Sequence, residues 1–93
     1  MLLSQNYKLS SNITFTELDD EMVLLDLNKG TYFGLNPVGA EIMLALLDNQ
    51  SAEQAGGRVA DRYGIELTKA MADTEELLAS LLAEGLISQH KPD

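Results

Sequence analysis

The sequence predicts an α+β fold in which a three-stranded antiparallel sheet is followed by three helices. Two observations lead to this prediction. The first third of the chain alternates short β-branched, aromatic or leucine-rich runs with turn residues, and later apolar residues recur at helical spacing. The length of 93 residues allows one modest core and no separate catalytic domain. We therefore expect a single domain over residues 1–93, with a core of about residues 5–88 and a frayed tail over residues 89–93.

The clearest local signal is a β-hairpin. Met22–Leu27 and Thr31–Leu35 are short strand-forming runs, and residues 28–30 (Asn-Lys-Gly) supply the turn between them. Because side chains alternate along a strand, Phe33 and Leu35 share one face, and we expect that face to lie against the core.

Two further strand segments precede the hairpin. Ile13–Leu18 is β-branched and aromatic, and Tyr7 and Leu9 alternate as in a short strand at the N-terminus. These segments predict an antiparallel meander of three strands, with a fourth short strand as an option. Gly34, in the middle of a strand run, indicates either a β-bulge or a place where another backbone approaches closely.

Capping residues mark the first two helices. Asn36 offers an N-cap oxygen and Pro37 suits the first helical position, so a strand leads into a helix with almost no loop. Ser51 and Gln54 form a capping box for the second helix, and Gly64 ends it. The short connection between these helices predicts a helix-turn-helix arrangement.

The third helix is expected over Thr68–Glu84, with Gly85 at its C′ position. Its main apolar stripe consists of Leu67, Met71, Thr74, Leu78, Leu81 and Leu82. A flanking line of mixed character consists of Ala70, Asp73, Leu77, Ser80 and Glu84. The helix therefore has more apolar surface than one packing face requires.

Composition excludes several classes of function. The formal net charge of −9 disfavours binding to nucleic acid or to an anionic membrane, and no run is long enough to span a membrane. The chain has no cysteine, which excludes disulfides and thiolate chemistry, and its N-terminus lacks a signal-peptide pattern. We expect a soluble cytoplasmic protein whose partner is apolar or basic.

No constellation for catalysis, a metal or a cofactor is recognisable. The lone His90 has no orienting partner, and the carboxylates near residues 19–21 and 75–76 lack the spacing of a calcium loop. The glycines form no phosphate-binding loop. Only Arg58 and Arg62 would serve a DNA-reading second helix, so DNA binding is disfavoured.

The hairpin and the segment after it resemble the signature of the PqqD-like family, the recognition elements for ribosomally made and later modified peptides. The resemblance rests on residues 24–40 (LLDLNKGTYFGLNPVGA) and continues through Tyr63-Gly64 and Leu82-x-x-Gly85-Leu86-Ile87. It covers roughly residues 5–88 and implies a winged helix-turn-helix topology. A free-standing chain of this size looks most like the leader-binding proteins of lasso-peptide pathways.

The resemblance implies that the chain binds the leader of a precursor peptide by strand addition, provided that Thr31–Leu35 is an edge strand. The third helix would form the other wall of the groove. A pocket near Tyr32 and Leu77 would take an aromatic or proline residue, and Asp73 or Glu76 a basic one. The expected peptide-binding residues are Thr31, Tyr32, Phe33, Gly34, Leu35, Ala70, Asp73, Glu76, Leu77 and Ser80.

In this hypothesis the protein is not an enzyme, and it delivers its peptide to a leader peptidase and then to a macrocyclase. Three alternatives stay open. The chain could present the precursor of pyrroloquinoline quinone, act as a winged helix-turn-helix regulator of transcription, or serve as a homodimerisation domain.

Overall fold

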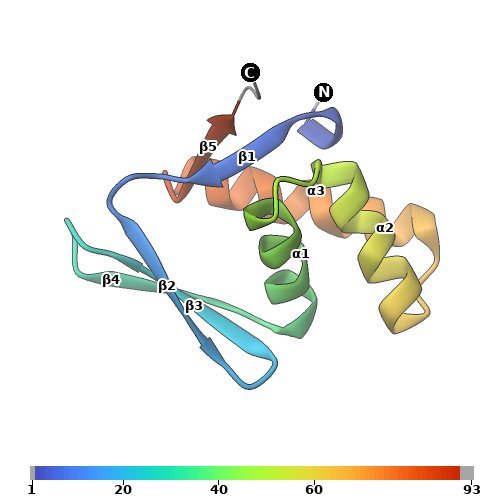
Figure 1. Ribbon diagram of the computed structural model, residues 1–93, viewed down its shortest axis with the longest axis horizontal. Coiled ribbons are helices and arrows are strands. Elements are labelled where there is room, and N and C mark those ends of the chain that lie inside the picture. Colours follow the sequence, from blue (N-terminus) through green and yellow to red (C-terminus); the bar gives the residue numbers. More distant parts are fainter. Residues whose placement is uncertain (1, 91–93) are drawn as a thin grey trace.

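Residues 2–90, which the computed structural model describes, fold as two small sheets beside three α-helices (Figure 1). The elements in chain order are a 3-10 turn at Leu2–Ser4, β1 (Asn6–Leu9), β2 (Ile13–Leu18), β3 (Glu21–Asp26), β4 (Thr31–Leu35), α1 (Pro37–Leu47), α2 (Ala52–Tyr63), α3 (Leu67–Ala83) and β5 (Ile87–His90). The prediction of an α+β fold with a three-stranded sheet before three helices is confirmed.

The larger sheet has the order β2-β3-β4, and both pairs are antiparallel. β4 is therefore an edge strand within the described chain, as strand addition requires. The register is continuous along β4, where Val23 lies opposite Gly34, so the bulge considered for Gly34 is absent. A Cβ atom at Gly34 would meet nothing within 4 Å.

The smaller sheet corrects two predictions. The N-terminal strand exists as β1, but it pairs with β5 and not with the meander. Gln89 lies opposite Tyr7, so the frayed tail expected from residue 89 is wrong for residues 89–90, and residues 91–93 lie outside the described part. The backbone N–H of Ser10 also donates to the carbonyl of Leu86 at 3.0 Å. These contacts place β1 and β5 side by side above the helices (Figure 1).

Each helix begins or ends where its capping residues predict. The side chain of Asn36 accepts a hydrogen bond from the N–H of Gly39, and both bonds of the Ser51–Gln54 capping box are present. At the end of α3, Gly85 has a φ of 71°. The N–H groups of Gly85 and Leu86 donate to the carbonyls of Leu82 and Leu81, which is a Schellman motif.

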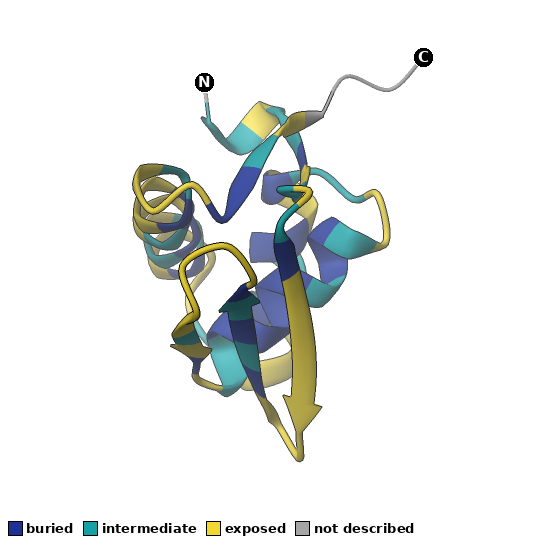
Figure 2. Ribbon diagram, turned by 90° about the vertical axis from the view of Figure 1, so that its left-hand side faces the viewer, coloured by how far each residue is buried: buried dark blue, intermediate teal, exposed yellow. Residues whose placement is uncertain are grey.

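The core lies between the helices and one face of the sheet. Met22 and Leu24 of β3 are fully buried, together with residues of all three helices (Figure 2). α2 packs closely on α3 at Gly56, where a Cβ atom would approach the sulfur of Met71 to 2.7 Å. Of the predicted core pair on β4, Leu35 is buried, but Phe33 is only partly covered.

Candidate functional site

The free edge of β4 presents its backbone in a defined pattern. The pairing of β2 with β3 decides which way each residue of β3, and hence of β4, points its backbone. The N–H of Leu27 donates to the C=O of Asn12 at 2.9 Å, so these two residues, which are opposite each other when the β2–β3 register is extended, form a hydrogen-bonded pair. Hydrogen-bonded pairs alternate along an antiparallel ladder, and each strand residue directs both backbone groups to one side. It follows that Thr31, Phe33 and Leu35 bond to β3, whereas the backbone groups of Tyr32 and Gly34 point to the open edge.

The side chains of β4 divide between the two faces of the sheet. Phe33 and Leu35 point toward the helices, and Tyr32 lies on the opposite face, where 73% of it is exposed. A strand added at the edge would therefore place alternate side chains beside Phe33, on the helix side, and beside Tyr32, on the outer face.

A cavity of about 410 Å³ lies directly beside this edge. Three elements line it, since α1 begins immediately after β4 and α3 runs alongside. Its residues are Phe33, Asn36, Val38, Gly39, Ile42, Asp73, Glu76, Leu77 and Ser80. Apolar and polar residues share the lining, and the polar ones include the carboxylates of Asp73 and Glu76 on its rim, a combination that suits a side chain with an apolar body and a polar end.

A second cavity of about 270 Å³ continues the groove past Phe33, which lines both cavities. It is lined by Asp26, Lys29, Thr31, Tyr32, Phe33, Glu84 and Leu86. The two cavities adjoin at Phe33, and we refer to them together as the groove beside β4.

Five of the expected site residues meet in the larger cavity, namely Phe33, Asp73, Glu76, Leu77 and Ser80. Two expectations differ from the structure. Ala70 is fully buried in the core and is not available to a ligand, and Tyr32 lines the second cavity and not the one that contains Leu77. Ala70 lies on the flanking line of α3 but belongs to the hydrophobic core.

The other expected residues of β4 have separate positions. Thr31 lines the second cavity, Gly34 contributes open backbone at the edge, and Leu35 is buried in the core. The N-cap and first turns of α1 also line the cavity, through Asn36, Val38, Gly39 and Ile42, and none of these residues was predicted for the site. The absence of a loop between β4 and α1 could have predicted this, because a helix that follows a strand directly must begin beside that strand.

The turn that leads into β4 is held by Asp26. Its Oδ1 accepts hydrogen bonds from the backbone N–H groups of Asn28 (2.9 Å) and Lys29 (3.0 Å) and from Nδ2 of Asn12 (3.0 Å). The bond from the Lys29 N–H is the largest cause that holds the pKa of Asp26 below its ordinary value, with smaller contributions from Asn12 and Asn28. The hairpin that carries the edge strand is thereby fixed at its turn.

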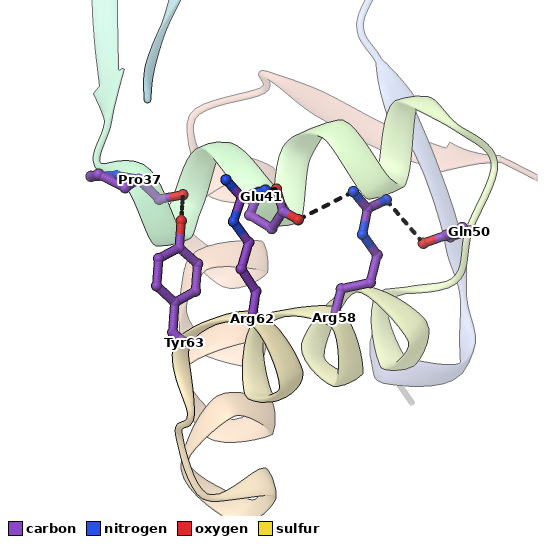
Figure 3. Close-up of polar contacts among 6 residues, drawn as sticks. All are labelled: Pro37, Glu41, Gln50, Arg58, Arg62 and Tyr63. Carbon is purple, nitrogen blue, oxygen red and sulfur yellow. Dashed lines mark hydrogen bonds and ion pairs between the residues drawn. The ribbon is translucent and has the colours of Figure 1, made fainter. Parts of the chain in front are cut away.

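The two arginines of α2 are held by α1 (Figure 3). Nη2 of Arg58 lies 3.2 Å from Oε1 of Glu41, and Nη1 of Arg62 lies 3.5 Å from Oε2 of the same carboxylate. The Tyr63 hydroxyl donates to the Pro37 carbonyl at 3.4 Å. Glu41 thus pairs with both arginines of α2, the cations that a DNA-reading second helix would present.

Residues 2–90 contain no candidate for a metal site or a membrane-spanning helix. No group of three or more His, Cys, Asp or Glu side chains in this part of the chain is placed to hold a metal ion. None of the described helices is both long and apolar enough to cross a membrane.

Residues 21–87 match the family model for coenzyme PQQ synthesis protein D, PqqD. The chain belongs to the PqqD family. The match includes β3, β4 and all three helices, so it covers both walls of the groove, and the resemblance inferred from the sequence is confirmed.

Two solved structures share the fold of this PqqD-family chain. One, described as TbiB1 in complex with the TbiA(beta) leader peptide, is 29% identical with a TM-score of 0.82, over 91% of this chain and 99% of that one. The other, lasso peptide synthetase B1 complexed with the leader peptide, is 32% identical with a TM-score of 0.82, over 89% and 98%. No curated protein matches the sequence.

Proposed function

We propose that this chain binds the leader region of a ribosomally made precursor peptide in lasso-peptide biosynthesis. The observation that carries the proposal is the open edge of β4 beside a cavity lined by β4, α1 and α3. The backbone of Tyr32 and Gly34 supplies donors and acceptors for an added strand, and the groove supplies pockets for alternate side chains. The two similar structures, whose descriptions include a leader peptide, support the same use of the fold.

The bound leader would be delivered to processing enzymes, first a leader peptidase and then a macrocyclase. The chain itself supplies binding and no bond-making chemistry in this scheme. Holding a peptide and an enzyme together raises the effective concentration of one for the other without new chemistry. We place this step in the cytoplasm.

The family match keeps one alternative in consideration, since its description names coenzyme PQQ synthesis. In that case the same groove would hold the precursor of pyrroloquinoline quinone. The two precursors can be compared directly in one binding assay, because both would use the β4 edge.

The test is a fluorescence anisotropy titration of a labelled lasso-precursor leader peptide, chosen from any such precursor encoded near this gene, with a scrambled leader as control. We expect saturable binding with a Kd of about 1 μM or tighter, equivalent to about −8 kcal/mol. Equal affinity for the scrambled peptide would contradict the proposal. A mass that depends on protein concentration, without peptide affinity, would instead support homodimerisation.

A further inference from the structure

The two carboxylates on the rim of the larger cavity are not equivalent. Asp73 is already paired, because Nζ of Lys69 lies 3.4 Å from its Oδ1 and 3.3 Å from its Oδ2. Glu76 lies one turn further along α3, is exposed, and lines the same cavity. No described side chain forms an ion pair or hydrogen bond with Glu76.

Lys69 is the only cation on α3, and helical spacing places it on the same side of the helix as Asp73 and Glu76. Its ammonium group therefore acts as an internal counter-ion at one end of the rim. The pair is exposed on the lysine side, where 68% of the side chain is accessible, so an incoming cation can displace or bypass it.

An added strand presents a side chain to the helix side at every second residue, a spacing of about 6.6–6.8 Å. One helical turn of α3 advances about 5.4 Å. A peptide residue in the apolar cavity, beside Phe33 and Leu77, thus has a groove-facing neighbour within reach of the rim carboxylates. A long basic side chain can lay its apolar stem along this surface and leave its charged head at the rim.

We infer that the groove selects a peptide that carries a lysine or arginine on its helix-facing side, two residues from the apolar residue that fills the cavity. Glu76 is the residue that pairs with this cation. Lys69 weakens the preference, since it occupies the neighbouring carboxylate of Asp73. This inference rests on the proposed function and specifies which of two acids reads the charge.

The experiment uses the full chain and the labelled leader peptide that binds in the titration above. Each leader residue is replaced in turn by lysine and, separately, by glutamine, and the ratio of the two Kd values is measured at low salt. At one helix-facing position, we expect the leader with lysine to bind about two- to fivefold more tightly than the leader with glutamine. This is the range that an exposed ion pair contributes. High salt should reduce this preference because exposed charges are screened.

Three variants assign the preference to its residue. Glu76→Gln should abolish the lysine preference at that position, and Lys69→Gln should increase it by releasing Asp73. Glu75→Gln is the matched control, because it removes the same charge from the adjacent position, which does not line the cavity. It should leave the ratio unchanged.

The outcomes separate the inference from the proposed function. A wild-type chain that binds no leader overturns both. A leader that binds, but with no position whose lysine preference depends on residue 76, overturns the inference alone. If Glu75→Gln changes the ratio of Kd values as much as Glu76→Gln does, the preference comes from net charge and the inference is overturned. If Lys69→Gln leaves the ratio unaltered, Lys69 does not compete for the rim carboxylates.

Discussion

The two edge strands of the larger sheet offer the same backbone chemistry but have different surroundings. β2 ends the sheet on one side, and by the ladder pattern the backbone groups of Phe15 and Glu17 point to its open edge. Nearly all of β2 is exposed (Figure 2). β4 ends the other side, where α1 and α3 turn the open edge into a groove with a cavity of about 410 Å³.

The turn after β2 is acidic, which is a second difference between the two edges. Asp19 and Asp20 follow the strand, and the cavity beside them is about 110 Å³ with several carboxylates on its lining. Charged residues at an edge are a common protection against unwanted strand pairing. Residues of α1 and α2 also line this small acidic cavity, whereas, of the two cavities, α3 lines only the larger one beside β4. We therefore attribute selectivity to the larger cavity and to the wall that α3 gives it.

The largest effect is expected from removing the apolar character of that wall. Leu77→Asp places a third carboxylate in the cavity beside Asp73 and Glu76, so leader affinity should fall by about 30-fold or more, or roughly 2 kcal/mol. Anisotropy titration measures the affinity, and circular dichroism checks that the fold is retained. Leu67→Asp is the matched control on the same helix, since Leu67 is exposed and lines no cavity in the groove. Equal affinity in Leu77→Asp would remove α3 from the site.

A smaller effect is expected from removing one backbone donor at the edge. Gly34→Pro deletes an N–H that points away from the sheet, a position where proline is compatible with an edge strand. We expect about a tenfold loss of affinity, or roughly 1.4 kcal/mol, from the lost hydrogen bond and the crowding of the added strand. The titration is the same.

Two controls connect this substitution to the comparison of the edges. Gly34→Ala keeps the N–H, and its Cβ atom meets nothing within 4 Å, so it should bind as the wild type does. Glu17→Pro makes the same change at the outward-facing backbone of β2 and should leave leader binding intact. If Glu17→Pro lowers leader affinity more than Gly34→Pro does, the peptide adds to β2 and not to β4, which would contradict the proposal.

The ion pairs of Glu41 with Arg58 and Arg62, which join α1 to α2, should affect the stability of the fold more than the binding specificity. Glu41→Gln removes the carboxylate that joins Arg58 and Arg62, and its side chain is only 9% exposed, whereas the arginines are partly in water. We expect a loss of about 1 kcal/mol in the free energy of unfolding, measured by urea denaturation. Glu75→Gln, the same change at an exposed position within α3, is the control. No difference between these variants would mean that the ion pairs do not hold α1 in place.

The smallest effect concerns the turn that leads into β4. The folded-state pKa of Asp26 lies below its ordinary value of 3.8, so ionised Asp26 stabilises the fold above that value. This stabilisation is lost as the pH falls below about 3.8 and through the lowered pKa. Asp26→Asn should therefore show a shallower fall of Tm with decreasing pH than the wild type. Parallel curves for the two proteins would argue against this role of Asp26.

The local signals of the sequence were sufficient for most of the fold. The bounds of β2 and β4, the Asn36 cap and the Gly85 end of α3 follow from residues that lie next to one another in the chain. The pairing of β1 with β5 was missed because it joins two segments of four residues from opposite ends of the chain. Neither segment carries a pattern that specifies its partner.

Five of the ten residues predicted to bind peptide lie around one cavity, and their role in binding stays a prediction. Phe33, Asp73, Glu76, Leu77 and Ser80 do share a cavity, because alternation on a strand and spacing on a helix decide which faces they occupy. The burial of Ala70 and the pairing of Arg58 with Glu41 depend on how closely the helices approach each other. Glu41 is the only charged residue in an otherwise apolar α1, and this was the available hint of a partner.

The most direct test of leader capture at the β4 edge is a backbone N-methylation scan of the leader, with an alanine scan of the same peptide beside it. Strand addition requires only alternate peptide N–H groups to face β4, so affinity should fall at every second position. If the leader runs antiparallel to β4, the residues whose N–H groups face β4 have side chains on the outer face, so the positions sensitive to N-methylation should alternate with the groove-facing positions sensitive to alanine. If the leader runs parallel to β4, the same residues should be sensitive to both changes. Losses without a period of two, or an affinity that no N-methyl group lowers, would contradict strand addition to β4.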